Sequence, residues 1–86
     1  MSYSVEVTAE ALANQERLTQ AVRERIGNKI DWLAENFEQI TPMSLSANLA
    51  GLFKLRVGDY RVIYSFDEDI RVITIHQIGH RREIYD

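Results

Sequence analysis

The chain has 86 residues, of which 45% are hydrophobic and 27% charged, and it contains no cysteine. This length supports one hydrophobic core, so we expect a single domain over residues 1–86. The lack of cysteine excludes disulfide scaffolds, thiolate metal sites and thiol nucleophiles. The start MSYSVEV does not resemble a signal peptide, and no apolar run approaches the roughly 20 residues that span a bilayer. We therefore expect a cytoplasmic protein with no membrane partner.

The net charge of -3 is unevenly distributed along the chain. Residues 1–50 carry four basic and seven acidic side chains, whereas residues 51–86 carry six of each and hold both histidines. An acidic protein is not a general binder of nucleic acid, because its overall field repels phosphate. Any binding of RNA therefore requires a local cluster of cations.

The first half of the chain predicts one strand followed by two helices. Residues 3–8 alternate in polarity as a strand does, and Thr8 can cap a helix from Ala9 to Leu18. Thr19 can cap a second helix. The buried stripe of this second helix is predicted from apolar residues at steps of three and four, namely Val22, Ile26, Ile30, Leu33 and Phe37.

Gly27 and Pro42 interrupt the helical pattern in different ways. Glycine costs a helix about 1 kcal/mol relative to alanine, so we expect a neighbour to pack closely on Gly27. Pro42 ends helical structure because it restricts Thr41 and has no backbone N–H. We expect residues 42–51 to form a connection with a single turn of helix.

The second half predicts an antiparallel meander. From residue 52 the apolar period changes to two, and strands are predicted over residues 52–57, 60–66 and 70–78. Gly58-Asp59 is typical of a two-residue hairpin loop, and residues 67–69 are typical of a tight acidic turn. The predicted fold class is therefore α+β, with an N-terminal strand, two helices and an antiparallel meander that packs one face on the helices.

A two-residue hairpin loop determines which side chains share a face of the sheet. It places Arg56 opposite Arg61 and Lys54 opposite Ile63. Because side chains alternate between the two faces, Lys54, Arg56 and Arg61 are predicted on one face, away from the helices.

The predicted pair of Arg56 and Arg61 brings two like charges together, which destabilises a strand pair by up to roughly 1 kcal/mol. Bound phosphate would offset this repulsion, because guanidinium groups chelate phosphate oxygens. The alternative interpretation is an ordinary solvated face, whose cations are neutralised by Asp59, Glu68 or Glu83. The pattern alone does not distinguish the two interpretations.

The C-terminal segment, residues 79–85, is rich in side chains that hold phosphate or move protons. His80, Arg81 and Tyr85 are the candidate functional residues there. His76 is predicted inside the last strand, where a histidine is more often structural, so we do not include it in the site.

Two runs of residues resemble the RelE/ParE superfamily of bacterial toxins. The first, residues 49–64, reads LAGLFKLRVGDYRVIY, and the second, residues 78–85, reads IGHRREIY. The helical half of the chain agrees with this superfamily only in element order and approximate length. The two runs at this spacing form a more specific signal than either run alone.

The resemblance implies a RelE-like fold and an enzymatic activity. In the RelE branch, the concave face of the sheet binds messenger RNA in the ribosomal A site, and the 2′-hydroxyl of the RNA attacks the neighbouring phosphate. No metal or cofactor takes part. The resemblance therefore implies a metal-independent endoribonuclease, an mRNA interferase that inhibits translation.

Carried over position by position, the resemblance assigns the site to Lys54, Arg56, Arg61, Arg81 and Tyr85. Arg56 and Arg61 suit stabilisation of the charge that develops on the phosphorane. RelE carries lysine at the position of Arg56, and arginine is a poor general base because its pKa exceeds about 12. Lys54 can stabilise charge or act as the base, and Tyr85 can stack on a nucleobase or help to remove the proton.

We add His80 to the predicted site as a general acid or base. Toxins of the YoeB type resemble this tail in placing a histidine close to the terminal tyrosine. The segment between Arg81 and Tyr85 is two residues shorter here than in RelE, so His80 is predicted to compensate.

Two alternative functions share this fold. The ParE branch poisons DNA gyrase and lacks the full catalytic set, and a toxin relic would retain only antitoxin binding and act as a co-repressor. The complete set of candidate residues favours the nuclease. The expected partners are a cognate antitoxin and messenger RNA in the ribosomal A site, with operator DNA reached only through the antitoxin.

Overall fold

The computed structural model describes residues 2–45 and 51–84. Its elements in chain order are β1 (Ser4–Val7), α1 (Ala9–Glu16), α2 (Gln20–Asn36), the short 3-10 helix η1 (Phe37–Gln39), β2 (Met43–Ser44), β3 (Phe53–Val57), β4 (Tyr60–Asp67) and β5 (Val72–His80). This order confirms the predicted α+β fold of a strand, two helices and an antiparallel meander. No helix in the described ranges is long and apolar enough to cross a membrane.

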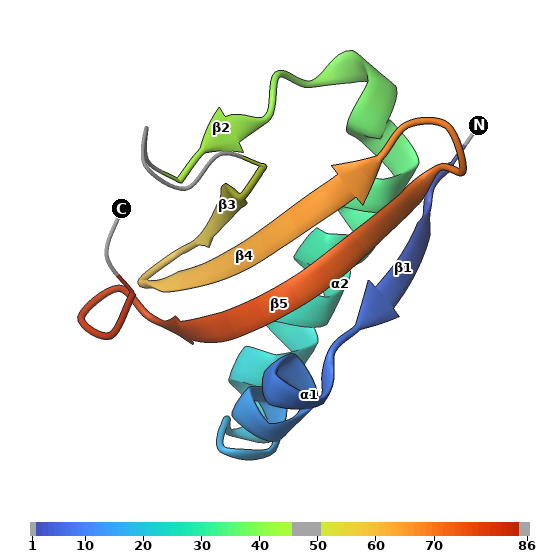
Figure 1. Ribbon diagram of the computed structural model, residues 1–86. Helices are drawn as coiled ribbons and strands as arrows, with labels where there is room; N and C mark the ends of the chain where they lie inside the picture. The colour runs from blue at the N-terminus through green and yellow to red at the C-terminus, as the bar shows by residue number, and fades with distance from the viewer. Residues whose placement is uncertain (1, 46–50, 85–86) are drawn as a thin grey trace.

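The strands form a single five-stranded sheet in the order β1-β5-β4-β3-β2. β1 is parallel to β5, whereas the other neighbours are antiparallel. Both helices lie against one face of this sheet (Figure 1). We call the opposite face, which carries the side chains of Lys54, Arg56, Arg61 and Ile63, the outer face.

The helix starts agree with the predicted caps. The hydroxyl of Thr8 accepts a hydrogen bond from the N–H of Ala11, and that of Thr19 accepts one from Val22. α1 ends at Glu16, two residues before the predicted end at Leu18. Each cap satisfies a backbone donor that the first helical turn leaves unpaired.

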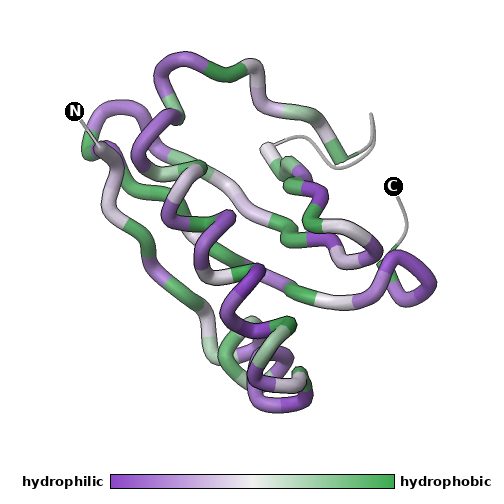
Figure 2. Tube along the Cα trace, turned by 180° about the vertical axis from the view of Figure 1, so that it is seen from behind, coloured by the Kyte–Doolittle hydropathy of each residue, from purple (hydrophilic) through white to green (hydrophobic). Residues whose placement is uncertain are grey.

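The predicted stripe of α2 packs on the sheet. Ile26, Ile30, Leu33 and Phe37 are buried, and Val22 is partly buried against the same core. Along the mostly hydrophilic α2, hydrophobic residues recur at intervals (Figure 2). This stripe joins the buried side chains of the helix-facing sheet surface, which include Leu55, Val62, Tyr64, Ile73 and Ile75.

The expected close contact at Gly27 is wrong. A Cβ atom built on Gly27 has nothing within 4 Å among the described atoms. Packing in this structure therefore gives no reason for glycine at this position. Glycine at this position therefore makes the helix less stable by about 1 kcal/mol than alanine would.

The connection after α2 differs from the prediction. Residues 43–44 form β2, which pairs with β3 and extends the sheet by one edge strand that the sequence did not indicate. This strand is too short for a period of two to be recognised. The predicted single turn of helix falls largely on residues 46–50, which lie outside the described residues.

The last turn is longer than predicted. β4 extends to Asp67 and β5 begins at Val72, so the turn comprises residues 68–71. The carboxylate of Asp67 accepts hydrogen bonds from the N–H groups of Asp69 and Ile70, and Arg71 adopts a positive φ of 55°. Arg71 also forms an ion pair with Glu38, which ties this turn to η1.

Candidate functional site

The β3-β4 hairpin has the predicted register. Arg56 pairs with Arg61, Lys54 pairs with Ile63, and Val57 pairs with Tyr60 across the two-residue loop. Leu55 and Val62, which alternate with these cations, are buried against the helices. The hairpin therefore gathers Lys54, Arg56 and Arg61 on the outer face, as predicted.

The tight loop depends on Gly58. Its φ of 59° is one that residues with a Cβ atom rarely adopt, and an added Cβ would lie 2.6 Å from Nη2 of Arg25. Arg25 of α2 thus brings a further guanidinium group to the hairpin tip. The sequence analysis did not identify this residue, because its approach depends on how α2 packs on the sheet.

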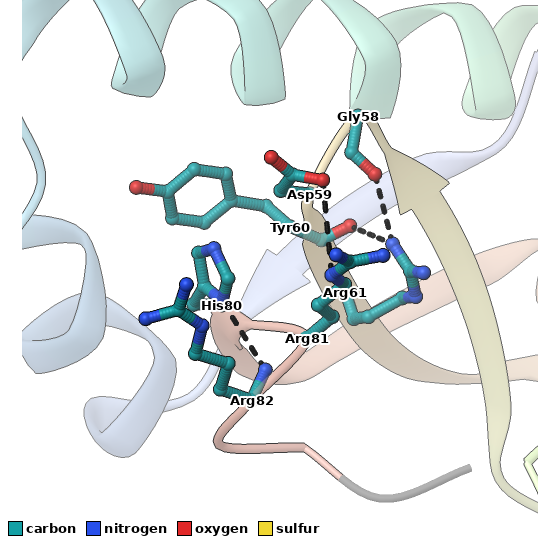
Figure 3. Close-up of polar contacts among 7 residues, drawn as sticks. All are labelled: Gly58, Asp59, Tyr60, Arg61, His80, Arg81 and Arg82. Carbon is teal, nitrogen blue, oxygen red and sulfur yellow. Dashed lines mark hydrogen bonds and ion pairs between the residues drawn. The ribbon is translucent and has the colours of Figure 1, made fainter.

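The guanidinium group of Arg61 is held over the hairpin loop. Its Nη1 donates hydrogen bonds of 2.9 Å to the carbonyl oxygens of Gly58 and Tyr60 (Figure 3). Its Nε is buried and has no hydrogen-bond partner among the described residues. A buried donor of a charged group without an acceptor is unfavourable, so this placement of the guanidinium group costs stability.

Arg81 attaches the C-terminal tail to the hairpin. Its backbone N–H donates a 2.7 Å hydrogen bond to the carbonyl oxygen of Asp59. Its side-chain Nε lies 3.8 Å from the Asp59 carboxylate, and both side chains are more than 60% exposed. An ion pair this exposed adds little stability, so the backbone bond provides the connection.

His80 lies on the other side of the sheet from Arg61. It pairs with Tyr60, whose side chain alternates with that of the buried Val62 and so faces the helices. The rings of His80 and Tyr60 meet edge to face, with centroids 5.4 Å apart, and Figure 3 shows them together and away from Arg61. The structure therefore does not bring His80 together with the three outer-face cations.

The imidazole of His80 is already used within the tail. Its Nδ1 accepts a hydrogen bond of 3.2 Å from the N–H of Arg82, and its own backbone N–H donates to the carboxylate of Glu83. Because Nδ1 is an acceptor here, the proton of neutral His80 is carried by Nε2. His80 thus helps to shape the turn that follows β5.

Comparison with known proteins identifies the family. Residues 5–85 match the family model described as the ParE toxin of the type II toxin-antitoxin system parDE. The chain belongs to the RelE/ParE superfamily of type II toxins. Toxin RelG of Mycobacterium tuberculosis is 39% identical over 41 residues, so the match spans about half of each protein, 48% of this chain and 47% of RelG.

Solved structures of both branches share the fold. A chain of the toxin-antitoxin complex RelBE2 from Mycobacterium tuberculosis superposes with a TM-score of 0.84 at 24% identity, covering 94% of this chain and 93% of that one. A chain of the ParDE system from P. aeruginosa gives a TM-score of 0.73 at 14% identity, covering 92% and 96%. The predicted RelE-like fold is therefore confirmed.

Part of the outer face of this RelE/ParE toxin is covered by its own chain. Ile63 and Ile84 are buried in a second small cluster with Leu45. Gly79 lies beneath Ile84, because a Cβ atom on Gly79 would lie 3.2 Å from Cδ1 of Ile84. The tail thus crosses the outer face beside Arg61, whose partner on β5 is Gly79. Tyr85, a predicted site residue, lies outside the described residues.

The toxin carries its other histidine on the outer face. A bulge makes Ile63 pair with Gln77 but Tyr64 pair with Ile75, so His76 is the extra residue of β5. Its Nε2 lies 2.7 Å from Oγ of Ser65, whose side chain alternates with that of Ile63. The sequence analysis set His76 aside as structural. The bulge, which no sequence signal marks, decides which face it occupies.

Proposed function

We propose that this chain is an mRNA endoribonuclease that acts on ribosomes and inhibits translation. The observation that carries the proposal is the cross-strand pair of Arg56 and Arg61 beside Lys54 on the outer face of a chain with net charge -3. This arrangement concentrates positive charge where folding alone does not require it. Phosphate is the chemical group that such a cluster recognises.

The proposed reaction uses no metal ion or cofactor, because the RNA supplies its own nucleophile. The 2′-oxygen of the RNA attacks the adjacent phosphorus, its proton is removed, and the 5′-oxygen leaves with a proton, so a cyclic 2′,3′-phosphate forms. Arg56 and Arg61 would stabilise the charge of the phosphorane because they remain cationic and present forked donors. The hydrogen bonds from Nη1 of Arg61 to the carbonyl oxygens of Gly58 and Tyr60 support this role, since they fix the guanidinium group before RNA binds.

The remaining predicted residues have separate proposed roles. Lys54 would bind phosphate or remove the 2′ proton. Arg81 would bind phosphate from the tail, close to the hairpin loop. We keep Tyr85 as a proposed base-stacking or proton-transfer residue. For His80, the contact with Arg82 favours a role in positioning the tail that carries Arg81 and Tyr85.

A cognate antitoxin is the proposed protein partner. Structurally similar chains come from toxin-antitoxin complexes of Mycobacterium tuberculosis and Pyrococcus horikoshii. Binding of such a partner over Lys54, Arg56 and Arg61 would block access of RNA. Operator DNA would then be contacted only through the antitoxin. Because the proposed substrate is bound to ribosomes, the proposed location is the cytoplasm.

Inhibition of DNA gyrase is the second candidate function. The matched family model is named for ParE, and His80 is separated from the outer-face cations. In that case the basic face would be a binding surface and no RNA would be cut.

The decisive experiment measures cleavage of messenger RNA on purified ribosomes with an open A site, using toxin that was treated with EDTA and desalted beforehand, with a gyrase supercoiling assay in parallel. Wild type should cut the RNA equally well with or without this prior removal of metal from the toxin, whereas Arg61→Ala and Arg81→Ala should lose most of the activity. Arg23→Ala, which removes a cation on the exposed side of α2, is the matched control and should retain it. Gyrase inhibition without cleavage would overturn the proposal.

A further inference from the structure

A pocket of about 670 Å³ lies between α1 and the C-terminal end of β5. β1 pairs with β5 only as far as Ile75, so on that side residues 76–80 have no strand neighbour in the described part of the chain. The side chain of Asn14 reaches this free edge, where its Oδ1 accepts a 2.9 Å hydrogen bond from the N–H of Ile78. This bond holds α1 beside the strand, and the space between them remains open as the pocket.

The pocket adjoins the proposed RNA-cleaving site. Gly79 lines the pocket, and it is the partner of Arg61 across the β4-β5 pair. Ile84, which covers Gly79 on the outer face, lines the pocket as well. The chain between them carries Arg81, whose N–H is bonded to the hairpin loop. A nucleotide held by Arg61 or Arg81 can therefore direct its base into the pocket.

Two aromatic rings, those of Tyr60 and His80, form part of the lining. They meet edge to face with centroids 5.4 Å apart, and both residues are partly buried (Figure 3). The imidazole of His80 is held by the N–H of Arg82, which donates to Nδ1. Aromatic side chains fixed in this way are the usual stacking partners of unpaired nucleobases.

The charged groups of the lining favour a neutral ligand over a phosphate. Glu10 and Glu83 contribute two carboxylates and Arg17 one guanidinium group, and the described lining contains no other lysine, arginine, aspartate or glutamate. This excess of negative charge repels an anion. One oxygen of Glu83 accepts a hydrogen bond from the N–H of His80, so the carboxylate is held in place and its second oxygen can accept another donor.

Two amide side chains complete the polar lining. Asn14 uses its Oδ1 for Ile78, and its NH2 group is a donor that this bond does not use. Gln77 lines the pocket from β5 and can both donate and accept. Side-chain amides pair with the edges of nucleobases through two parallel hydrogen bonds. The lining thus combines aromatic rings, amides and carboxylates, which together match a nucleobase that carries an amino group.

We propose that this pocket receives one unstacked base of the RNA substrate and selects a base with an exocyclic amino group. The base stacks on the aromatic rings, its amino group donates to the carboxylate of Glu83, and its ring edge pairs with the amide of Gln77. Adenine, cytosine and guanine carry such an amino group. Uracil carries only carbonyl oxygens outside its ring, which a carboxylate repels, so uracil leaves Glu83 without a donor. The inference rests on the proposed function and adds a base preference to it.

Binding of nucleosides tests the pocket without ribosomes and without cleavage. The probes are adenosine, cytidine and uridine, and NMR follows the backbone N–H of Gly79 and the side-chain NH2 groups of Asn14 and Gln77. Adenosine and cytidine should shift these signals, with dissociation constants about tenfold lower than that of uridine. Equal binding of uridine, or no shift with any of the three nucleosides at millimolar concentration, would overturn the inference.

Glu83→Gln tests the selection directly. Glutamine retains an oxygen for the N–H of His80 and replaces the second carboxylate oxygen with an NH2 donor. The variant should therefore bind uridine more tightly than cytidine, the reverse of wild type. Glu16→Gln is the matched control, because it removes an exposed carboxylate of α1 that does not line the pocket. It should bind as wild type does, and thermal melting verifies that both variants are folded.

The same preference should appear in the ribosomal cleavage assay. With the three A-site bases changed one at a time, uracil should reduce wild-type cleavage about tenfold at one of the three positions. Glu83→Gln should lose this discrimination, whereas Glu16→Gln should retain it. Equal cleavage by wild type whichever base stands at each position would also overturn the inference.

The outcomes separate this inference from the proposed function. If RNA is cut but no nucleoside shifts the pocket signals, the assignment of the pocket is wrong. If the nucleosides bind and Glu83→Gln reverses their order but no RNA is cut, the pocket is a nucleobase site and the nuclease proposal fails. Shifts confined to β3 would place the base elsewhere on the toxin and contradict the inference.

Discussion

Arg56 and Arg61 lie directly opposite each other across the β3-β4 hairpin, with both side chains on the face that the helices do not cover. Like charges in this arrangement weaken the strand pair. The neighbouring positions on the other face, Leu55 and Val62, are buried and apolar as stability requires. One face of the hairpin thus carries apolar side chains that pack against the helices. The other face carries a pair of like charges that stability does not explain.

Replacing Arg56 with threonine should separate stability from activity. Arg56→Thr removes the like-charge pair and introduces a residue that favours strands, so the free energy of unfolding should rise by up to about 1 kcal/mol. Cleavage on ribosomes should fall about 100-fold if the guanidinium group stabilises the transition state. Urea unfolding and the cleavage assay measure the two effects on the same sample.

Arg23→Thr is the control for this substitution, since Arg23 is exposed on α2 and its guanidinium group donates to the carbonyl oxygen of Leu18. It should leave cleavage unchanged. A decrease in stability for Arg56→Thr would mean that Arg56 is neutralised within the fold, which is the ordinary solvated-face interpretation.

Burial of Tyr64 should make the protein sensitive to alkali. The side chain is 1% exposed, and desolvation raises the pKa of its phenol to about 12 from 10.0. Because the folded state then holds this proton more tightly than the unfolded state, the associated stability is present below pH 10 and is lost as pH rises through about 12. The expected loss is about 2 kcal/mol at pH 12.

Urea unfolding at pH 9 and pH 12 measures this loss. Tyr64→Phe should be less sensitive to the same rise in pH, because the titrating group is absent. Equal losses in wild type and Tyr64→Phe would assign alkaline unfolding to other groups.

Gly27→Ala should stabilise the toxin. An added methyl group meets no atom within 4 Å, and alanine is favoured over glycine in a helix by about 1 kcal/mol. Thermal melting should show a higher midpoint with unchanged antitoxin binding. The same substitution at Gly58 is the contrasting case: the positive φ and the approach of Arg25 should make Gly58→Ala destabilising. A lower melting midpoint for Gly27→Ala would contradict this expectation.

The role of His80 can be tested with two substitutions of different shape. Asparagine can retain an acceptor near the position of Nδ1 for the N–H of Arg82, whereas glutamine extends toward the position of Nε2. If His80 positions the tail, His80→Asn should cleave RNA better than His80→Gln, and the pH profile of cleavage should be unchanged. If both variants lose activity and the pH profile changes, His80 carries a proton in the reaction.

Much of the fold could be predicted because its signals are local. The caps at Thr8 and Thr19, the helical stripe of α2 and the two-residue loop at Gly58 each arise from a few neighbouring residues. The register of the hairpin follows from the loop length alone, and with it the common face of Lys54, Arg56 and Arg61. The proposed site residues on this hairpin could therefore be predicted without a structure.

The amino-acid sequence by itself determined the order of elements and the cationic face of the hairpin, because period, capping and loop length act over short distances. Only the tertiary structure decided the addition of β2 at the sheet edge and the separation of the two histidines between opposite faces. A single extra residue at the β5 bulge places His76 beside Ser65, while His80 packs on Tyr60. Such outcomes depend on pairing between distant segments, where a shift of one residue exchanges the faces of a strand.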